Sequence, residues 1–124
     1  MNQERIIQNK FSVEGKVVII TGGAGFLGRQ YTDALTKAGA TVVVWDNHEG
    51  RMNEARELFK DNQNTRFVLL DVTDEKSVQE GVKKVIGEFG KIDVLLNNAA
   101  MNPAVGSQEA EKQFALYEEY SIEL

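Results

Sequence analysis

The sequence has no cysteine and only one histidine among its 124 residues. Without cysteine, the chain has no disulfide framework, no thiolate nucleophile and no cysteine metal site. A single histidine also argues against a transition-metal site, and we predict no metal ligands. Chemistry that depends on thiols or on a resident metal ion is therefore not expected.

Excess positive charge and a long apolar leader are also missing. The formal charge is −5, and the lysines and arginines are scattered along the chain, which argues against a nucleic acid or an anionic membrane as partner. Residues 1–10 are a polar N-terminal extension without the apolar stretch that a signal peptide needs. We therefore expect a cytoplasmic protein with no nucleic-acid partner and no membrane partner.

What the sequence does contain is a regular alternation of apolar, β-rich runs and amphipathic helical patterns. Strands are predicted at residues 17–21, 41–45, 67–70 and 92–96. The alternation is typical of a parallel sheet with helical crossovers. Right-handed crossovers then predict the spatial strand order 3-2-1-4 in one α/β domain that spans residues 1–124.

Three helices are predicted between these strands, each with an apolar face. The first follows Gly25, the second covers residues 51–60, and the third begins at Thr73 or Asp74 as its cap and ends at Gly90. Their predicted buried faces consist of Leu27, Tyr31, Ala34, Leu35 and Ala38 in the first, Met52, Ala55, Leu58 and Phe59 in the second, and Val78, Val82, Val85, Ile86 and Phe89 in the third.

Three spaced glycines connect the first strand to the first helix. Gly22 is expected to make the tight turn, Gly25 to let the backbone approach a phosphate, and Gly28 to let the helix pack on the sheet. A helix N-terminus attracts a pyrophosphate because it has free N–H groups and the positive end of the helix dipole. Because such turns also occur for purely structural reasons, the glycines alone leave both interpretations open.

An acidic residue, Asp46, ends the second predicted strand. An acid at this place hydrogen-bonds the adenosine ribose hydroxyls and repels a 2′-phosphate, which predicts NAD as the cofactor and NADP as the weaker ligand. The pair Asp46 and Asn47 is also a common turn sequence. His48 and Arg51 follow closely, and a basic side chain there would neutralise a 2′-phosphate, so that the preference for NAD is not absolute.

The sequence also predicts the surroundings of His48, Trp45 and Thr21. The structural interpretation of His48 is a solvated loop residue near the adenosine, and Trp45 is expected in the core. Thr21 is expected to brace the glycine turn by a hydrogen bond, or to be an ordinary threonine at the end of a strand.

Taken together, these segments resemble the N-terminal half of a short-chain dehydrogenase/reductase. The resemblance rests on residues 21–28 (Thr-Gly-Gly-Ala-Gly-Phe-Leu-Gly), Asp46, residues 71–72 (Asp-Val) and residues 92–100 (Ile-Asp-Val-Leu-Leu-Asn-Asn-Ala-Ala), and it extends over residues 11–124. It implies a Rossmann-like, partial doubly wound sheet and an NAD(P)-dependent oxidoreductase that transfers a hydride between nicotinamide and an alcohol or ketone. A small-molecule substrate is then the expected partner of the full-length protein.

The resemblance also implies a set of cofactor-binding residues. Asp71 and Val72 would flank the adenine ring, Asn97 would hold the central strands together, and Ala99 would lie along the cofactor ribose. The complete set is Gly22, Gly25, Phe26, Leu27, Gly28, Asp46, Asn47, Asp71, Val72, Asn97 and Ala99.

One departure from the family concerns the glycine spacing. Gly25 stands at the fifth position of the motif and Phe26 at the sixth, where many members have glycine. This spacing resembles the extended branch of the family, whereas the Asn-Asn-Ala-Ala segment does not. The mixture suggests a polyol, sugar or sugar-derived substrate.

The second departure concerns catalysis, for which we predict no residue in this chain. The family uses a Tyr-x-x-x-Lys pair, but the residues four places after Tyr31, Tyr117 and Tyr120 are leucine, serine and leucine. Residues 121–124 are typical of the first turn of a new helix. We therefore expect a chain that is truncated before the catalytic serine, tyrosine and lysine, lacks the C-terminal half of the fold and is inactive alone.

The fourth strand is then expected to form an open sheet edge. Unpaired N–H and C=O groups beside an apolar run favour pairing with another chain, so that we expect either a homo-oligomer through residues 92–96 or a cover by residues 101–124. Within the latter segment, residues 110–120 have a helical pattern after a loop at Pro103 and Gly106.

Two other function classes remain open from the sequence. One is a complete, non-enzymatic dinucleotide-binding module that self-associates, which the missing tyrosine–lysine pair favours. The other is a methyltransferase, whose fold shares the glycine turn and the acid after the second strand. Thr21-Gly22 directly after the strand and the Asn-Asn-Ala-Ala segment argue against the methyltransferase.

Overall fold

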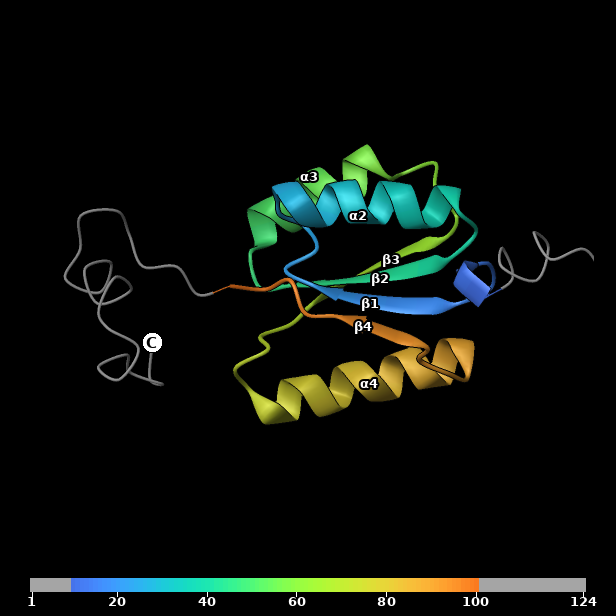
Figure 1. The fold of residues 1–124 in the computed structure, drawn as a ribbon. Helices are drawn as coiled ribbons and strands as arrows, with labels where there is room; N and C mark the ends of the chain where they lie inside the picture. The colour runs from blue at the N-terminus through green and yellow to red at the C-terminus, as the bar shows by residue number, and fades with distance from the viewer. Residues whose placement is uncertain (1–9, 101–124) are drawn as a thin grey trace, which may run out of the picture.

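A four-stranded parallel sheet separates two layers of helices in the computed structural model, which describes residues 10–100 (Figure 1). Its order is β3-β2-β1-β4, as predicted. Helices α2 and α3 cover one face and α4 covers the other (Figure 1). The elements are β1 Val17–Thr21, α2 Phe26–Lys37, β2 Thr41–Asp46, α3 Glu49–Leu58, β3 Thr65–Leu69, α4 Glu75–Phe89 and β4 Val94–Leu96.

The core lies on both sides of the two central strands, because alternate side chains of β1 and β2 point to opposite faces. All five residues of β1 are buried, as predicted for a central parallel strand. Toward α2 and α3, Val18, Ile20, Val42 and Val44 pack with Met52 and Ala55. Toward α4, Val17, Ile19, Val43 and Trp45 pack with Leu70 and Val85, which confirms Trp45 as a core residue.

Two element boundaries differ from the prediction for identifiable reasons. β4 begins at Val94 and not at residue 92, because the Asp93 carboxylate accepts the backbone N–H of Val17 at 2.8 Å in place of a strand carbonyl. α3 begins at Glu49 and not at residue 51, because the side chain of His48 accepts the N–H of Arg51 at 3.1 Å and caps the helix. His48 is thus an exposed helix cap.

β3 also differs, since it begins at Thr65 and ends at Leu69 where we predicted residues 67–70. The strand starts with two polar residues, Thr65 and Arg66, so that a search for apolar runs predicted its start too late. Asp74 caps α4 by accepting the N–H of Lys76 at 3.1 Å, and Gly90 ends the helix at a φ of 76°, as predicted.

The buried face of α2 is not the predicted one. Leu27 and Tyr31 are exposed, and the helix instead buries Gly28, Thr32 and Thr36 against the sheet. The threonine hydroxyls donate to helix carbonyls at 2.8 Å, Thr32 to Gly28 and Thr36 to Thr32. Because these polar groups are satisfied within the helix, small side chains can face the core and bring α2 close to the sheet.

Five further predicted core positions also lie at the surface. Ala34 in α2 and Ala38 at its C-cap are exposed. In α3, Leu58 is 62% exposed, although Met52, Ala55 and the C-cap residue Phe59 are buried as predicted. In α4, Val82 and Ile86 are 36% and 43% exposed. The helical periodicity predicted a wide apolar face for each helix, but the sheet covers only the middle of that face. The expected cover by residues 101–124 and the helix at residues 110–120 lie outside the described residues.

The described residues also bear on the membrane. Within residues 10–100, no helix combines the length and the apolar character needed to cross a bilayer.

A close backbone approach joins α2 to the glycine turn. A Cβ atom on Gly28 would lie 2.4 Å from the Cα of Gly23, and one on Gly23 would lie 2.8 Å from Cγ1 of Val44. Both distances are shorter than carbon atoms tolerate. The turn therefore holds α2 directly on the sheet.

Gly28→Ala is expected to destabilise the fold by about 2 kcal/mol, because the added methyl group overpacks rigid backbone. Urea denaturation followed by circular dichroism measures this change. The matched control is Gly87→Ala in α4, where an added Cβ meets no atom within 4 Å. Since alanine favours a helix interior, the control should gain about 0.5 kcal/mol or more. Equal effects of the two changes would contradict the packing account.

Acid is expected to weaken the junction of β4 with β1. The bond from the Val17 N–H, and then the Lys91 ammonium at 2.9 Å, lower the pKa of Asp93. A lowered pKa stabilises the fold at pH values above the unfolded carboxyl pKa of about 3.9, and this contribution disappears as the pH falls through the folded-state pKa. Asp93→Ala should therefore lower the urea midpoint of unfolding at pH 6. The midpoint of this variant should also fall less between pH 6 and pH 3 than that of the wild-type protein. Asp61→Ala, at an exposed position, is the control and should show neither change.

Candidate functional site

The predicted site residues meet at the carboxyl edge of the sheet. β1, β2, β3 and β4 run parallel, so that the segments that follow them leave the sheet at the same edge (Figure 1). These segments are the glycine turn at residues 22–25, the Asp46–Asn47 pair, the Asp71–Val72 pair and residues 97–99. Ligands of open α/β sheets bind outside this edge.

Gly22 is required at its position by two independent constraints. Its φ is +63°, a conformation that glycine adopts without strain. In addition, a Cβ atom there would lie 2.9 Å from the Cα of Ala99. Gly25 differs, because the nearest atom to its added Cβ would be the Gly22 carbonyl oxygen at 3.4 Å. Glycine at position 25 therefore leaves free the space that a side chain would fill beside the Gly22 carbonyl.

The N-terminus of α2 has neither of the groups that normally compensate a helix start. Its N-cap, Gly25, makes no side-chain hydrogen bond, and the first turn holds no acidic residue. By contrast, α3 and α4 have side-chain caps at His48 and Asp74 and acidic residues in their first turns. The first N–H of α2 that bonds within the helix is that of Arg29, to Gly25 at 3.0 Å. The preceding N–H groups and the positive dipole end suit an anion.

Asp46 is buried and fastens the glycine turn to the start of α3. Its Oδ2 accepts the N–H of Ala24 at 3.2 Å, and its Oδ1 accepts the N–H of His48 at 3.0 Å. The guanidinium of Arg51 lies 3.6 Å from Oδ1. Each carboxylate oxygen has two acceptor positions, of which these N–H groups use one, and Arg51 lies beside the second position on Oδ1. The side chain of Asp46 is 3% exposed. Asn47 is exposed beside it.

The exit of β4 is held against the turn by a threonine and an asparagine. Thr21 Oγ1 accepts the N–H groups of Asn98 and Ala99, each at 3.1 Å, and the amide of Asn98 donates to the Gly22 carbonyl at 3.2 Å. The hydroxyl of Thr21 therefore braces β4 and not the turn itself.

The asparagine that makes this connection is Asn98, whereas we expected Asn97 to hold the strands together. Neighbouring residues of an extended chain point to opposite sides, and Leu96 packs toward the α2 side of the sheet. Asn98 shares this side, while Asn97 is exposed. The alternation of β4 was the sequence signal that could have distinguished them.

Asp71 and Val72 form an exposed corner after β3. The Asp71 carboxylate accepts the hydroxyl of Thr73 at 2.6 Å and its N–H at 2.9 Å, and these two bonds lower the pKa of Asp71. The bonds fix the corner, and Val72 next to it is 41% exposed. An apolar side chain at this edge offers a surface on which a flat ring can pack.

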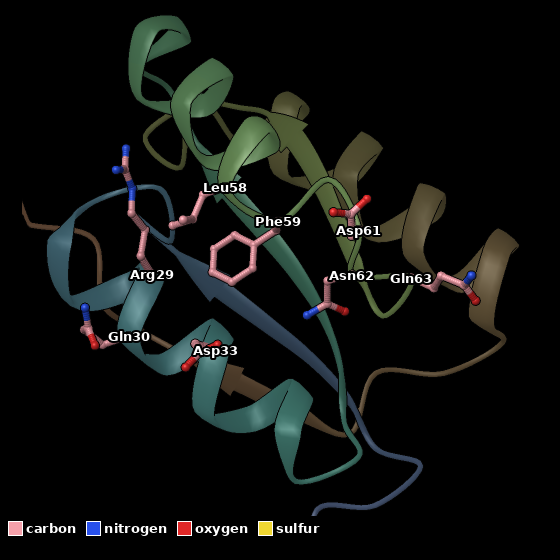
Figure 2. A pocket seen from close by; sticks show the side chains of 8 residues that line it. All are labelled: Arg29, Gln30, Asp33, Leu58, Phe59, Asp61, Asn62 and Gln63. Atoms are coloured by element: carbon pink, nitrogen blue, oxygen red, sulfur yellow. The ribbon is translucent and has the colours of Figure 1, made fainter.

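A groove away from the sheet edge lies between α2 and the segment at the end of α3 (Figure 2). This groove of about 570 Å³ is lined by Arg29, Gln30, Asp33, Leu58, Phe59, Asp61, Asn62 and Gln63. Its charged groups are partly paired, Arg29 with Glu54 at 2.9 Å and Asp33 with Lys37 at 2.8 Å. None of the predicted cofactor-binding residues lines it. The sheet edge, where those residues meet, is therefore the candidate site.

The described residues do not build a metal centre. Across residues 10–100, no three histidine, aspartate or glutamate side chains come together in a way that could hold an ion.

Comparison with known proteins matches the chain to one family. The family model described as short chain dehydrogenase matches residues 16–122. Among curated proteins, 15-hydroxyprostaglandin dehydrogenase [NAD(+)] of Rattus norvegicus is 37% identical over 93 residues, which cover 73% of this chain and 35% of that protein.

Solved structures resemble the chain in both fold and sequence, as two of them illustrate. NAD⁺-bound xylitol dehydrogenase has a TM-score of 0.68 at 31% identity, with 74% of this chain and 36% of that chain covered. The N-domain of a bacterial malonyl-CoA reductase with NADP has a TM-score of 0.67 at 34% identity, with 73% and 17% covered. The chain thus spans little more than a third of the rat protein, and its relatives include binders of either cofactor.

Proposed function

This chain belongs to the short-chain dehydrogenase family, and we propose that it binds the adenosine and pyrophosphate of NAD for a short-chain oxidoreductase. One observation carries the proposal. The uncapped, acid-free N-terminus of α2 lies beside the Ala24–Asp46 hydrogen bond, so that an anion site and a ribose acceptor share one edge of the sheet.

The pyrophosphate is assigned to the first turn of α2. The N–H groups of Phe26, Leu27 and Gly28 precede the first bonded N–H of the helix, and Gly25 has no side chain to block an approaching phosphate. The side chains of Phe26 and Leu27 are 80% and 54% exposed at the same place. We assign them to contacts along the cofactor.

The adenosine is assigned to the ends of β2 and β3. The carboxylate of Asp46 would receive the ribose hydroxyls, and Asn47 lies next to it. Val72, on the corner fixed by Asp71, would pack against the adenine ring. At the other end of the cofactor, Ala99 lies against Gly22 and would line the second ribose, with Asn97 exposed beside it.

In this proposal the chain positions the cofactor and takes no part in proton transfer. The sequence has no tyrosine followed four residues later by lysine, so that we assign it no acid–base group. When bound, the nicotinamide supplies the hydride chemistry, and a fixed cofactor lowers the entropic cost of that step. A sugar-like alcohol or ketone as substrate is supported by the Gly25 spacing and by the similarity to xylitol dehydrogenase.

Titration calorimetry with NAD⁺ and NADP⁺ tests the cofactor assignment. We expect NAD⁺ to bind more tightly, and Asp46→Ala to reduce the ratio of the two affinities by about tenfold, since a hydrogen bond to a charged group contributes about 1.5 kcal/mol or more. Asp61→Ala, in the groove of Figure 2, is the matched control and should leave the ratio unchanged. An unchanged ratio in Asp46→Ala would remove the NAD assignment, and binding of neither cofactor would remove the proposed function.

A self-associating module remains the second candidate, and the edge of β4 favours it. Within the described part of the chain, β1 is the strand that pairs with β4, and Leu95 on this edge strand is 53% exposed. On α4, Glu88 faces β3, since it pairs with Arg66 at 2.6 Å. Val82 and Ile86 lie on the opposite flank, toward β4. We propose that a second copy of the chain covers this apolar edge.

Leu95→Lys is expected to weaken self-association by tenfold or more, because burying a leucine side chain contributes about 1.5–3 kcal/mol. Sedimentation velocity across a concentration series measures the dimer dissociation constant. Leu58→Lys is the control, since Leu58 is also exposed but belongs to the opposite helical layer. A monomeric wild-type protein, or an equal effect of both changes, would rule out this edge as the interface.

A further inference from the structure

Arg29 bonds to two consecutive carbonyl groups at the start of α2. Its backbone N–H donates to the Gly25 carbonyl at 3.0 Å, and its side-chain Nε donates to the Ala24 carbonyl at 2.7 Å. The bond to Ala24 is the shorter of the two, and its donor is charged, which places it in the stronger class of hydrogen bonds. Arg29 therefore fixes both carbonyl groups that border the first turn of α2.

The guanidinium of Arg29 is itself held by α3. Its Nη2 donates to the Glu54 carboxylate at 2.9 Å and to the Arg51 carbonyl at 3.4 Å. Figure 2 shows this side chain extending from α2. The side chain of Arg29 is 25% exposed, and that of Glu54 is 70% exposed. Because Nε and Nη2 both donate to protein acceptors and Glu54 offsets the charge, the contacts of Arg29 hold the backbone and do not present it as an anion ligand.

The bond to the Ala24 carbonyl bears on where α2 begins. In an α-helix each carbonyl accepts the N–H four residues later, so that a helix one residue longer would use the Ala24 carbonyl for the N–H of Gly28. The N–H groups of Gly23, Ala24 and Gly25 already donate within the protein, each at 3.2 Å. By occupying the Ala24 carbonyl, Arg29 keeps the Gly28 N–H available to an anion.

We propose that Arg29, held by Glu54, is a positioning residue for the diphosphate, because it keeps the first turn of α2 open. The proposal rests on the proposed function, since it concerns the same pyrophosphate site. It adds a residue that lies outside the assigned cofactor contacts. The effect of Arg29 is confined to the phosphates, because the adenosine is assigned to the ends of β2 and β3. Glu54 then supports anion binding although it carries a negative charge.

Calorimetric titration of the full chain with NAD⁺, adenosine 5′-diphosphate and adenosine tests this role. Arg29→Ala should weaken the binding of NAD⁺ and of the diphosphate about tenfold, as expected for one charged hydrogen-bonding group. Adenosine binding should be unchanged. Lys37→Ala is the matched control, since Lys37 is also on α2 and pairs with Asp33 at 2.8 Å, and it should change none of the three affinities. An equal loss of diphosphate and adenosine affinity in Arg29→Ala would overturn the proposal.

Glu54→Ala distinguishes positioning from direct contact with the phosphate. If Arg29 positions the turn, loss of its partner should weaken diphosphate binding about threefold, as expected for an exposed ion pair. If Arg29 binds the phosphate itself, the released guanidinium should bind it more tightly, and this result would overturn the proposal. Glu57→Ala removes the same charge from the same helix, where Glu57 pairs with Lys60 at 3.0 Å, and should leave diphosphate binding unchanged.

The wild-type titration separates this proposal from the proposed function. If the wild-type chain binds NAD⁺ and Arg29→Ala binds it equally well, the role of Arg29 is overturned and the proposed function stands. A wild-type chain that binds none of the three ligands overturns both. The comparison of Glu54→Ala with Glu57→Ala decides the matter if Arg29→Ala does not fold, because both glutamates are exposed.

Discussion

The backbone contact between Gly28 and Gly23 determines where the other parts of the site lie. Because no Cβ atom separates the two residues, α2 begins directly on the glycine turn and its N-terminus opens at the carboxyl edge of the sheet. The hydrogen bond from Ala24 to Asp46 then fixes the turn to the end of β2, and the bond from the Asn98 amide to Gly22 fixes it to the exit of β4. Thr21, at the end of β1, accepts an N–H group of the same exit. One close packing contact thus places three strand ends around a helix start.

The electrostatics of this edge follow from the same arrangement. The first turn of α2 presents uncompensated N–H groups, whereas α3 and α4 have side-chain caps and acidic first turns. A buried carboxylate lies next to that positive helix end, and a half-exposed guanidinium lies over the carboxylate. In the proposed function, attraction for a diphosphate and selection at the ribose would therefore come from neighbouring but separate groups.

Sequence patterns predicted the parts of the fold that depend on continuous apolar runs. β1, β2 and the strand order are as predicted, because a buried parallel strand needs such a run and crossovers have one hand. The prediction of the buried face of α2 was wrong, because threonines whose hydroxyls bond to helix carbonyls take the place of apolar side chains there. Among the site residues, Gly22 and Gly28 have identifiable structural requirements. Gly23 and Asn98 were missed because the contact of Gly23 with Val44 and the bond of Asn98 to Gly22 join segments that are far apart in the sequence.

Nuclear magnetic resonance of the ¹⁵N-labelled chain, titrated with NAD⁺, shows directly whether the cofactor binds at the sheet edge. We expect amide signals to shift at the first turn of α2, at Asp46 and Asn47, at Val72 and at Ala99. Shifts confined to the groove between α2 and α3 (Figure 2), or no shifts at saturating NAD⁺, would contradict the assignment of the sheet edge as the cofactor site.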